Sequence, residues 1–194
     1  MKKALLEKNR IEAISDGIYA IAMTLAVLSI DVSTIDPTHS SLISGLPRMA
    51  EELRHYIIAF VTLAGFWVGQ HFLMDRIKRT DTGLNWIVMF HLMFIALIPA
   101  TTDLLGNFDS VLVVQLFCLN IFFVSLTISL EYLYARKHSE LGPSHELKKH
   151  ISHGTFIFPT FSVLVFVMAW PLGDWAPLLY VLMPLIHKLP RVDN

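Results

Sequence analysis

Charged side chains are scarce in this sequence of 194 residues: Asp, Glu, Lys and Arg make up 16% of it, against 54% hydrophobic residues. Soluble domains carry roughly one-quarter charged residues, so water is not the main solvent of this chain. Several apolar runs reach about the 18–20 residues needed to cross the hydrocarbon core of a bilayer. The composition therefore predicts an all-α integral membrane protein.

Cysteine and glycine-rich segments are also lacking. Cys118 is the only cysteine, which excludes an intrachain disulfide and a thiolate metal cluster. Glycine is not concentrated in any segment, so the sequence contains neither a phosphate-cradling loop nor a TVGYG-type carbonyl filter. The net charge is −1 and no basic patch is interleaved with aromatic residues, which argues against a nucleic-acid partner.

Catalytic patterns are missing as well. The sequence contains no His-Glu-x-x-His motif, no paired aspartates at membrane depth and no serine with a plausible base. His145, His150 and His153 lie close together in sequence, but we interpret their segment as a solvated loop because only Glu146 offers a carboxylate nearby. We expect no enzyme activity, no metal site and no cofactor.

The apolar runs predict a single domain over residues 1–194 with six transmembrane helices. A polar loop is expected at 31–40, and an amphipathic segment at 41–54 leads into the second span. The sixth span is short and contains Pro177 and Pro184, which a membrane helix tolerates only where neighbours satisfy the freed carbonyls. The expected spans are 10–30, 55–75, 84–105, 110–134, 151–170 and 175–189.

Positive charges indicate the orientation. With the N-terminus in the cytoplasm, almost all Lys and Arg residues that flank the spans lie on the cytoplasmic side, and only Arg48 and Arg54 lie outside. This bias also supports the sixth span, since it keeps Lys188 and Arg191 inside. We therefore expect a multi-pass protein of the cell membrane with both termini cytoplasmic.

The first span has two different faces. At about 100° per residue, one stripe holds Arg10, Ile14, Gly17, Ile21, Thr24, Leu25 and Leu28. Asp16 falls on the opposite face, near the cytoplasmic end, where a charge is costly unless it is paired. Asp16 therefore needs a partner from another helix, either as a structural anchor or in gating. Periodicity alone is also compatible with ordinary helix packing for the stripe.

The first span carries a motif that resembles the transmembrane protein 175 family of potassium channels. The family pattern Arg-x-x-x-Phe-Ser-Asp-Gly, with a Thr eight residues after the Asp, corresponds here to Arg10, Ile14, Ser15, Asp16, Gly17 and Thr24, with Ile for Phe. In the second span Trp67 and His71 match Trp-x-x-His-His, and Gln70 replaces the first His. Asn85 and residues 98–103 resemble the third span. The resemblance, to a prokaryotic member of the family, covers most of residues 8–106.

This resemblance implies a potassium-selective or potassium-preferring channel. It implies a symmetric homotetramer, embedded in membrane lipid, in which the first helix of each subunit lines a central pore for monovalent cations, K⁺ above all. Carried over by position, the constriction is Ile21, followed by Leu25 and Leu28, with Thr24 as the nearest polar group. A ring of aliphatic side chains offers an ion no ligands, so it gates by closing or by losing its water.

A polar network at the cytoplasmic end is a further expectation. We predict that Arg10, Ser15, Asp16, Trp67 and His71 hold the pore helix in place there. Two other functions stay open. Asp16 and His71 are titratable, which makes a proton-permeable channel an alternative. A secondary transporter is the other, although no second copy of the motif is present for the repeats that such folds use.

Overall fold

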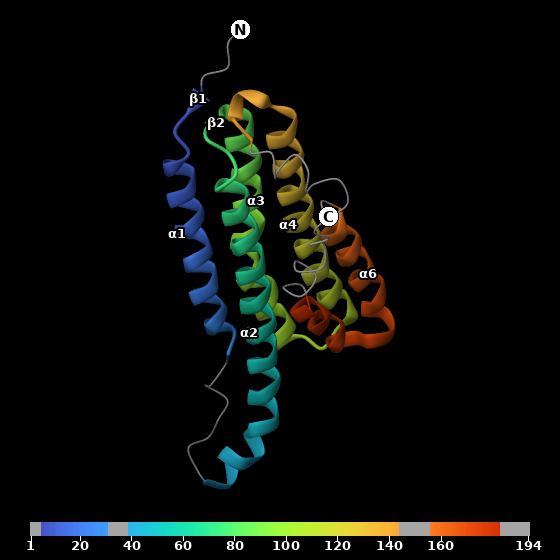
Figure 1. Ribbon diagram of the computed structural model, residues 1–194. Coiled ribbons are helices and arrows are strands. Elements are labelled where there is room, and N and C mark those ends of the chain that lie inside the picture. The colour runs from blue at the N-terminus through green and yellow to red at the C-terminus, as the bar shows by residue number, and fades with distance from the viewer. Residues whose placement is uncertain (1–4, 31–38, 144–155, 183–194) are drawn as a thin grey trace, which may run out of the picture.

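The computed structural model describes residues 5–30, 39–143 and 156–182, and it is a bundle of helices (Figure 1). Its long elements are α1 (Asn9–Leu25), α2 (His39–Met74), α3 (Thr82–Asn107), α4 (Val111–Lys137) and α6 (Ile157–Leu172). The 3₁₀ segments η1 (Ala26–Ser29), η2 (Ser139–Leu141) and η3 (Gly173–Leu182) follow three of them. Two short strands, β1 (Leu5–Leu6) and β2 (Thr80–Asp81), pair antiparallel.

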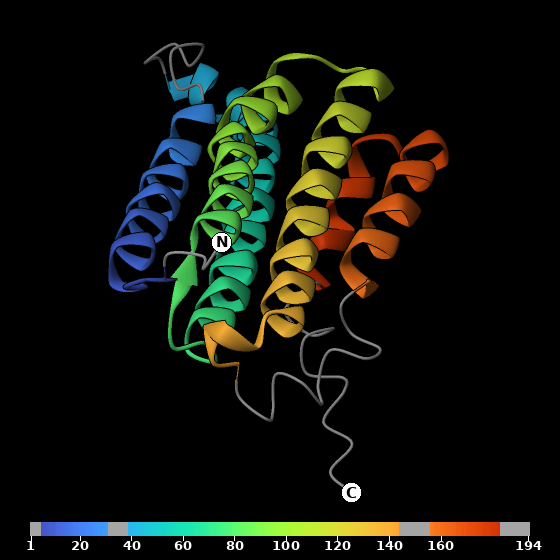
Figure 2. The ribbon, with the colours of Figure 1, turned by 90° about the horizontal axis from the view of Figure 1, so that it is seen from above.

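Helix α3 occupies the middle of the bundle, because it packs against α1, α2 and α4. Helix α6 packs on α4, and η3 folds back against α6, α2 and α4. Seen from above, α1 and α6 lie at opposite edges (Figure 2). An edge helix is covered on one side only, so much of the α1 surface is left for contacts outside the chain.

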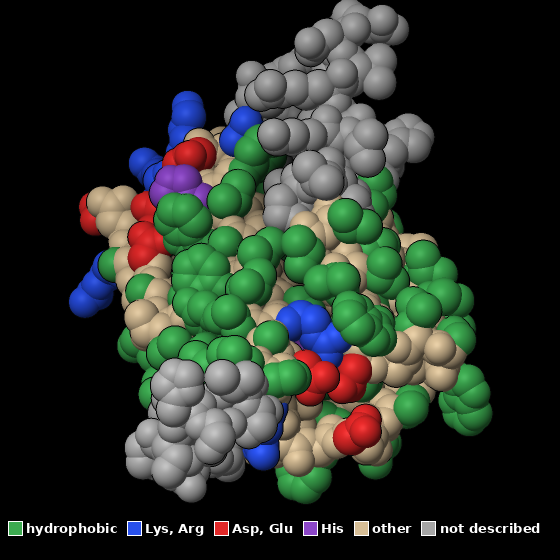
Figure 3. Space-filling view, turned by 90° about the horizontal axis from the view of Figure 1, so that it is seen from below, with side chains coloured by type: hydrophobic (Ala, Val, Ile, Leu, Met, Phe, Trp, Pro, Cys, Tyr) green, Lys and Arg blue, Asp and Glu red, His purple; other side chains and the backbone are tan. Residues whose placement is uncertain are grey.

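Within the described ranges, five stretches are long and apolar enough to cross a membrane by length and composition: Asn9–Ser29, Gly45–Met74, Thr82–Asn107, Val111–Lys137 and Ile157–Leu182. Large apolar side chains such as Trp170 and Leu28 point out of the bundle, and hydrophobic side chains are spread widely over the face in Figure 3. In water such a surface would be unfavourable. The chain is a multi-pass helical membrane protein.

Two expected segments can be compared with the structure. The segment 41–54, expected to lead into the second span, forms the first part of α2, which runs from His39 to Met74. The expected sixth span, 175–189, begins in η3, which is a 3₁₀ helix up to Leu182. Gly173, with a φ of 51°, ends α6, and a left-handed residue at this position turns the chain out of the helix.

Several expectations fall partly on residues outside the described ranges. They concern most of the polar loop at 31–40, the first residues of the span 151–170 and the last residues of the span 175–189. The described part of the fifth span lies in α6. Six spans therefore stay a prediction.

One end of the bundle is tied together by loop contacts. The Lys8 ammonium donates to the carbonyl of Met74 at 2.9 Å, and the amide of Lys78 donates to the carbonyl of Leu141 at 2.9 Å. These contacts join the start of α1 to the end of α2, and the segment after α2 to η2.

Asp81 completes this end of the bundle. Its carboxylate caps α3 by accepting from the amide of Leu84 at 2.8 Å, and it also accepts from the Tyr134 hydroxyl at 2.8 Å. A capping carboxylate satisfies an amide that the first turn of a helix would otherwise leave free. The start of α3 is thereby fixed to the end of α4.

Candidate functional site: the two faces of the first helix

Helix α1 is attached to the bundle through one narrow face. Ile11, Ser15, Tyr19 and Ala22 are buried on this face, and Ala26 continues it into η1. The contacts are made with α3 and α2. Alanine at two of these positions lets the helices approach closely, as small residues do between membrane helices.

The stripe predicted from the sequence lies on the exposed side of α1 and continues into η1 at Leu28. Ile21 is 58% exposed and Leu28 is 72% exposed, and Ile14 and Leu25 are exposed as well. The stripe is therefore not wedged inside the protomer. These large aliphatic side chains extend along about four turns of an edge helix, and they form a surface that either lipid or another copy of the chain can cover. The other exposed members of the stripe are Arg10, Gly17 and Thr24.

Thr24 is the polar group within the stripe. Its hydroxyl donates back to the helix, with the carbonyl oxygens of Ala20 and Ile21 at 3.0 and 2.9 Å. The hydrogen is thus used internally, while the oxygen keeps lone pairs directed outward. Thr24 can therefore offer an acceptor, the kind of group that a cation or a water molecule needs, between the apolar side chains of Ile21 and Leu25.

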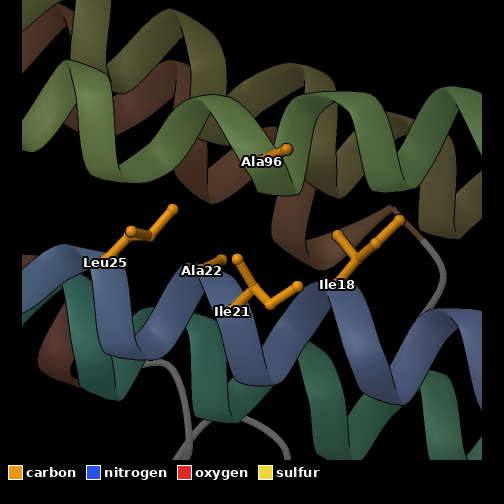
Figure 4. A pocket seen from close by; sticks show the side chains of 5 residues that line it. All are labelled: Ile18, Ile21, Ala22, Leu25 and Ala96. Carbon is orange, nitrogen blue, oxygen red and sulfur yellow. The ribbon is translucent and has the colours of Figure 1, made fainter.

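An apolar hollow of about 110 Å³ opens between α1 and α3, lined by Ile18, Ile21, Ala22, Leu25 and Ala96. Figure 4 shows Ile21 and Leu25 reaching from α1 toward the α3 residue Ala96. The hollow follows from Ala22 and Ala96, whose small side chains leave the space that their larger neighbours border. Its walls contain no charged group, so it fits an apolar side chain and offers no ligand to an ion.

Asp16 has the interhelical partner that its position demands. The indole Nε1 of Trp67, on α2, donates to Oδ1 of Asp16 at 2.9 Å. The Trp67 and His71 rings are 5.4 Å apart, and Nε2 of His71 lies 3.9 Å from Oδ2 of Asp75. The structure thus brings Asp16, Trp67 and His71 together into a row at the start of α1 and the end of α2.

Ser15 and Arg10 do not join this row. Ser15 is buried and its hydroxyl donates to the carbonyl of Ile11 at 2.8 Å, a bond within α1. It lies about 100° around the helix from Asp16, which points it into the bundle. Arg10 is exposed, and no hydrogen bond or ion pair among the described residues links it to Asp16 or His71. Within one protomer, the predicted network is therefore reduced to three members.

A second polar row, which the sequence analysis did not find, lies inside the bundle. The hydroxyl of Tyr19 on α1 is hydrogen-bonded to Nε2 of His91 on α3 at 2.7 Å, and Nδ1 of His91 is 3.0 Å from the Thr127 hydroxyl oxygen on α4. The Thr127 hydrogen is directed to main-chain carbonyls of α4. Its oxygen therefore accepts from Nδ1–H, and Nε2 accepts from Tyr19. This row ties three helices together.

Two further buried polar side chains lie close to this row. Glu131 on α4 is 0% exposed and Gln70 on α2 is 2% exposed. The sequence contained a signal for Glu131, because this residue places a charged side-chain type within the apolar run 110–134. His91 and its two partners gave no such signal, because each is common in the packed interior of helical proteins.

Metal ligands do not come together in this site. No group of three or more His, Cys, Asp or Glu side chains in the described ranges is arranged to hold a metal ion. His145, His150 and His153 lie outside those ranges. The geometry is instead that of a helical membrane protein with polar side chains between its helices and an apolar edge helix, whose outer face lipid or another membrane helix can cover.

Comparison with known proteins gives the family. The family model described as "Endosomal/lysosomal potassium channel TMEM175" matches residues 10–99, the segment that contains α1, the Trp67 row and most of α3. Curated bacterial relatives match about half of the chain, and a solved structure matches most of it. Over residues 10–99 the chain matches the TMEM175 family, and the resemblance noted in the first span is thereby confirmed.

Two bacterial relatives carry potassium-channel names. A protein named as a potassium channel in Streptomyces collinus is 31% identical over 102 residues, which are 53% of this chain and 49% of the relative. A potassium channel of Chamaesiphon minutus is 33% identical over 107 residues, with shares of 53% and 51%. The matches thus span about half the length of these relatives.

A vertebrate relative carries a different name. A zebrafish (Danio rerio) protein, named as an endosomal/lysosomal proton channel, is 32% identical over 133 residues, which are 62% of this chain and 26% of the relative. Members of the family are therefore named for two different permeant ions.

A solved structure shares the fold. It is the crystal structure described as a lysosomal potassium-selective channel TMEM175 homolog from Chamaesiphon minutus, with a TM-score of 0.78. The match covers 93% of this chain and 96% of that chain at 21% sequence identity. Because it extends beyond residue 99, the arrangement of α4, α6 and η3 also has a counterpart in a solved channel structure.

The Tyr19–His91 hydrogen bond yields a first prediction. We expect Tyr19→Phe to lower the free energy of unfolding by about 1–3 kcal/mol, because it leaves Nε2 of His91 buried without a partner. Thermal unfolding in detergent measures the change. Tyr56→Phe is the matched control, since Tyr56 is only half-buried and contacts the Phe60 ring. Equal stability of both variants would contradict the role assigned to this bond.

Proposed function

We propose that the chain is a potassium-selective or potassium-preferring channel, formed by four copies around an axis with α1 of each lining the pore. The observation that carries this proposal is the exposed stripe of Ile14, Ile21, Leu25 and Leu28 on a helix that carries the family motif. A purely lipid-facing helix needs only apolar side chains on its outer face. Here the outer face also contains the motif positions Arg10, Gly17 and Thr24.

Gating follows from the chemistry of the stripe. Four Ile21 side chains around an axis form an apolar ring with no ligand for an ion, so the ring stops flow by narrowing or by losing its water. Leu25 and Leu28 repeat this ring one and two turns further along. Thr24 supplies an outward oxygen between these rings, and a hydrated cation can use it once the pore is wide enough.

The Asp16–Trp67 hydrogen bond fixes the start of this pore helix against α2. Because it joins two helices near the predicted cytoplasmic mouth, it limits how far α1 can tilt or rotate there. Arg10 is exposed at the same end, and in the proposed tetramer it lies close to the neighbouring copies. We assign Arg10, Asp16, Trp67 and His71 to this mouth, and we assign Ser15 to the packing of α1.

The charge distribution supports the proposed orientation. Lys8, Arg76 and Arg136 lie at the end of the bundle where α1 and α3 begin, whereas Arg48 and Arg54 lie near the start of α2, toward the opposite end (Figure 1). Positive charge accumulates on the cytoplasmic side of membrane proteins. We therefore place both termini in the cytoplasm, with six spans in the cell membrane, no cofactor and no enzymatic activity.

Ile21→Asn tests the constriction. Replacing the apolar ring by a polar one favours retained water, so we expect a several-fold increase in potassium flux or a loss of selectivity against sodium. Single-channel recording or flux from liposomes measures it. Leu164→Asn is the control, because Leu164 is also exposed to the membrane but lies on α6. Unchanged currents in Ile21→Asn would exclude this residue as the constriction.

Cross-linking tests which face meets the axis. Cys118 is the only cysteine and is buried, so an added cysteine reports its own surroundings. We expect Leu28→Cys to form disulfide-linked dimers between copies under mild oxidation, since side chains close to an axis come within disulfide distance. Leu164→Cys, on the opposite edge of the bundle, should stay monomeric on a denaturing gel. Equal cross-linking of both variants would rule out a central α1.

Proton permeation is a second candidate, favoured by the vertebrate relative named as a proton channel. Reversal potentials measured across separate potassium and pH gradients distinguish the two ions. A potential that follows the potassium gradient and ignores the pH gradient supports the potassium channel. A potential that follows pH supports proton permeation, and counterflow without a dissipating current would instead indicate a secondary transporter.

A further inference from the structure

The interior of the protomer contains a carboxyl group that the pore mechanism does not use. Glu131 lies on α4 and is 0% exposed. Both of its oxygen atoms are inaccessible and make no hydrogen bond to the described residues. A fully buried carboxylate without a compensating partner is strongly unfavourable, whereas the protonated acid loses far less on leaving water.

Gln70 faces this carboxyl group from another helix. The Gln70 side chain on α2 is the polar group beside Glu131, and its amide nitrogen and oxygen are likewise inaccessible and unpaired among the described residues. Buried amide and carboxyl groups are almost always hydrogen-bonded. A protonated Glu131 can donate to the Gln70 oxygen and accept from its nitrogen, so one proton satisfies both side chains.

Hydroxyl and imidazole groups are the titratable neighbours of this pair. The hydroxyl groups are those of Tyr19 on α1 and Tyr132 on α4, which lie close enough to Glu131 to feel the negative charge that its ionised form would carry. His91 of α3 is occupied by its hydrogen bonds to Tyr19 and Thr127. Neither hydroxyl supplies a positive charge that would stabilise a carboxylate.

The Arg76 guanidinium has contacts of its own near the end of α2. Arg76, after the end of α2, lies 3.2 Å from the Phe72 ring centroid and donates to the Phe72 carbonyl. Neither Glu131 oxygen forms a hydrogen bond to Arg76 or to any other described residue. The surroundings of Glu131 therefore favour its neutral form.

We propose that Glu131 and Gln70 form a proton-binding site inside each protomer, separate from the pore stripe, with Glu131 protonated at neutral pH. The site lies beside Tyr19, the residue that fixes α1 to His91. Loss of the proton would place a negative charge against the inner face of α1 and loosen it. On the proposed channel function, proton release from Glu131 therefore changes potassium flux through α1, without acting on a group of the pore stripe itself.

Infrared spectroscopy of the purified, reconstituted protein tests the site directly. We expect a carbonyl band of a protonated carboxylic acid at neutral pH that shifts in heavy water and disappears in Glu131→Gln. Glu140→Gln is the matched control, because it makes the same change at an exposed position in η2; its band should persist. Absence of the band in the unmodified protein, or its persistence in Glu131→Gln, overturns the proposal.

Stability and flux measurements complete the test. The neutral isostere Glu131→Gln should melt at the same or a higher temperature than the unmodified protein. A drop of more than about 2–4 °C would indicate a paired carboxylate and overturn the site.

Potassium flux of the unmodified protein should change between neutral and alkaline pH. This change should be absent in Glu131→Gln but present in Glu140→Gln, and a pH response that persists in Glu131→Gln overturns the coupling. If the unmodified protein shows no flux at all, the channel proposal fails while the infrared result still decides the proton site.

Discussion

The rotation of α1 about its own axis governs which residues this chain presents to its surroundings. The Tyr19–His91–Thr127 row fixes one side of the helix to α3 and α4, and the Trp67 indole holds Asp16 against α2. In a medium of low polarity these hydrogen bonds have little water to compete with them. Because they set which side of α1 faces inward, they also turn the aliphatic stripe outward.

This arrangement distributes polarity in the opposite way from a soluble bundle. Polar side chains such as Gln70 and Glu131 lie between the helices, while much of the outward surface is apolar. Lipid gives no hydrophobic drive for helices to associate, so interhelical hydrogen bonds and close packing at small residues such as Ala22 hold the bundle together. The same reasoning explains how an exposed aliphatic stripe can be stable on the edge of the protomer.

The two proposals concern different parts of this arrangement. The channel proposal uses the outer face of α1, and the proton site uses the groups behind its inner face. Tyr19 is buried on the inner face, two residues before Ile21 on the outer face. A change at the inner face can therefore reach the stripe by moving α1 as a whole, which requires only a small rigid displacement of an edge helix.

The membrane class, the long apolar helices, the two faces of α1 and the resemblance to the TMEM175 family could all be predicted from the amino-acid sequence. Run length, periodicity and a local motif are properties of neighbouring residues. Three-dimensional packing was needed to show that Trp67 is the partner of Asp16, that Ser15 bonds within its own helix, and that His91 and Glu131 lie in the interior. Asp16 and Trp67, for example, are 51 positions apart in the chain. Such pairs are set by how the helices pack against one another, and no local pattern encodes that packing.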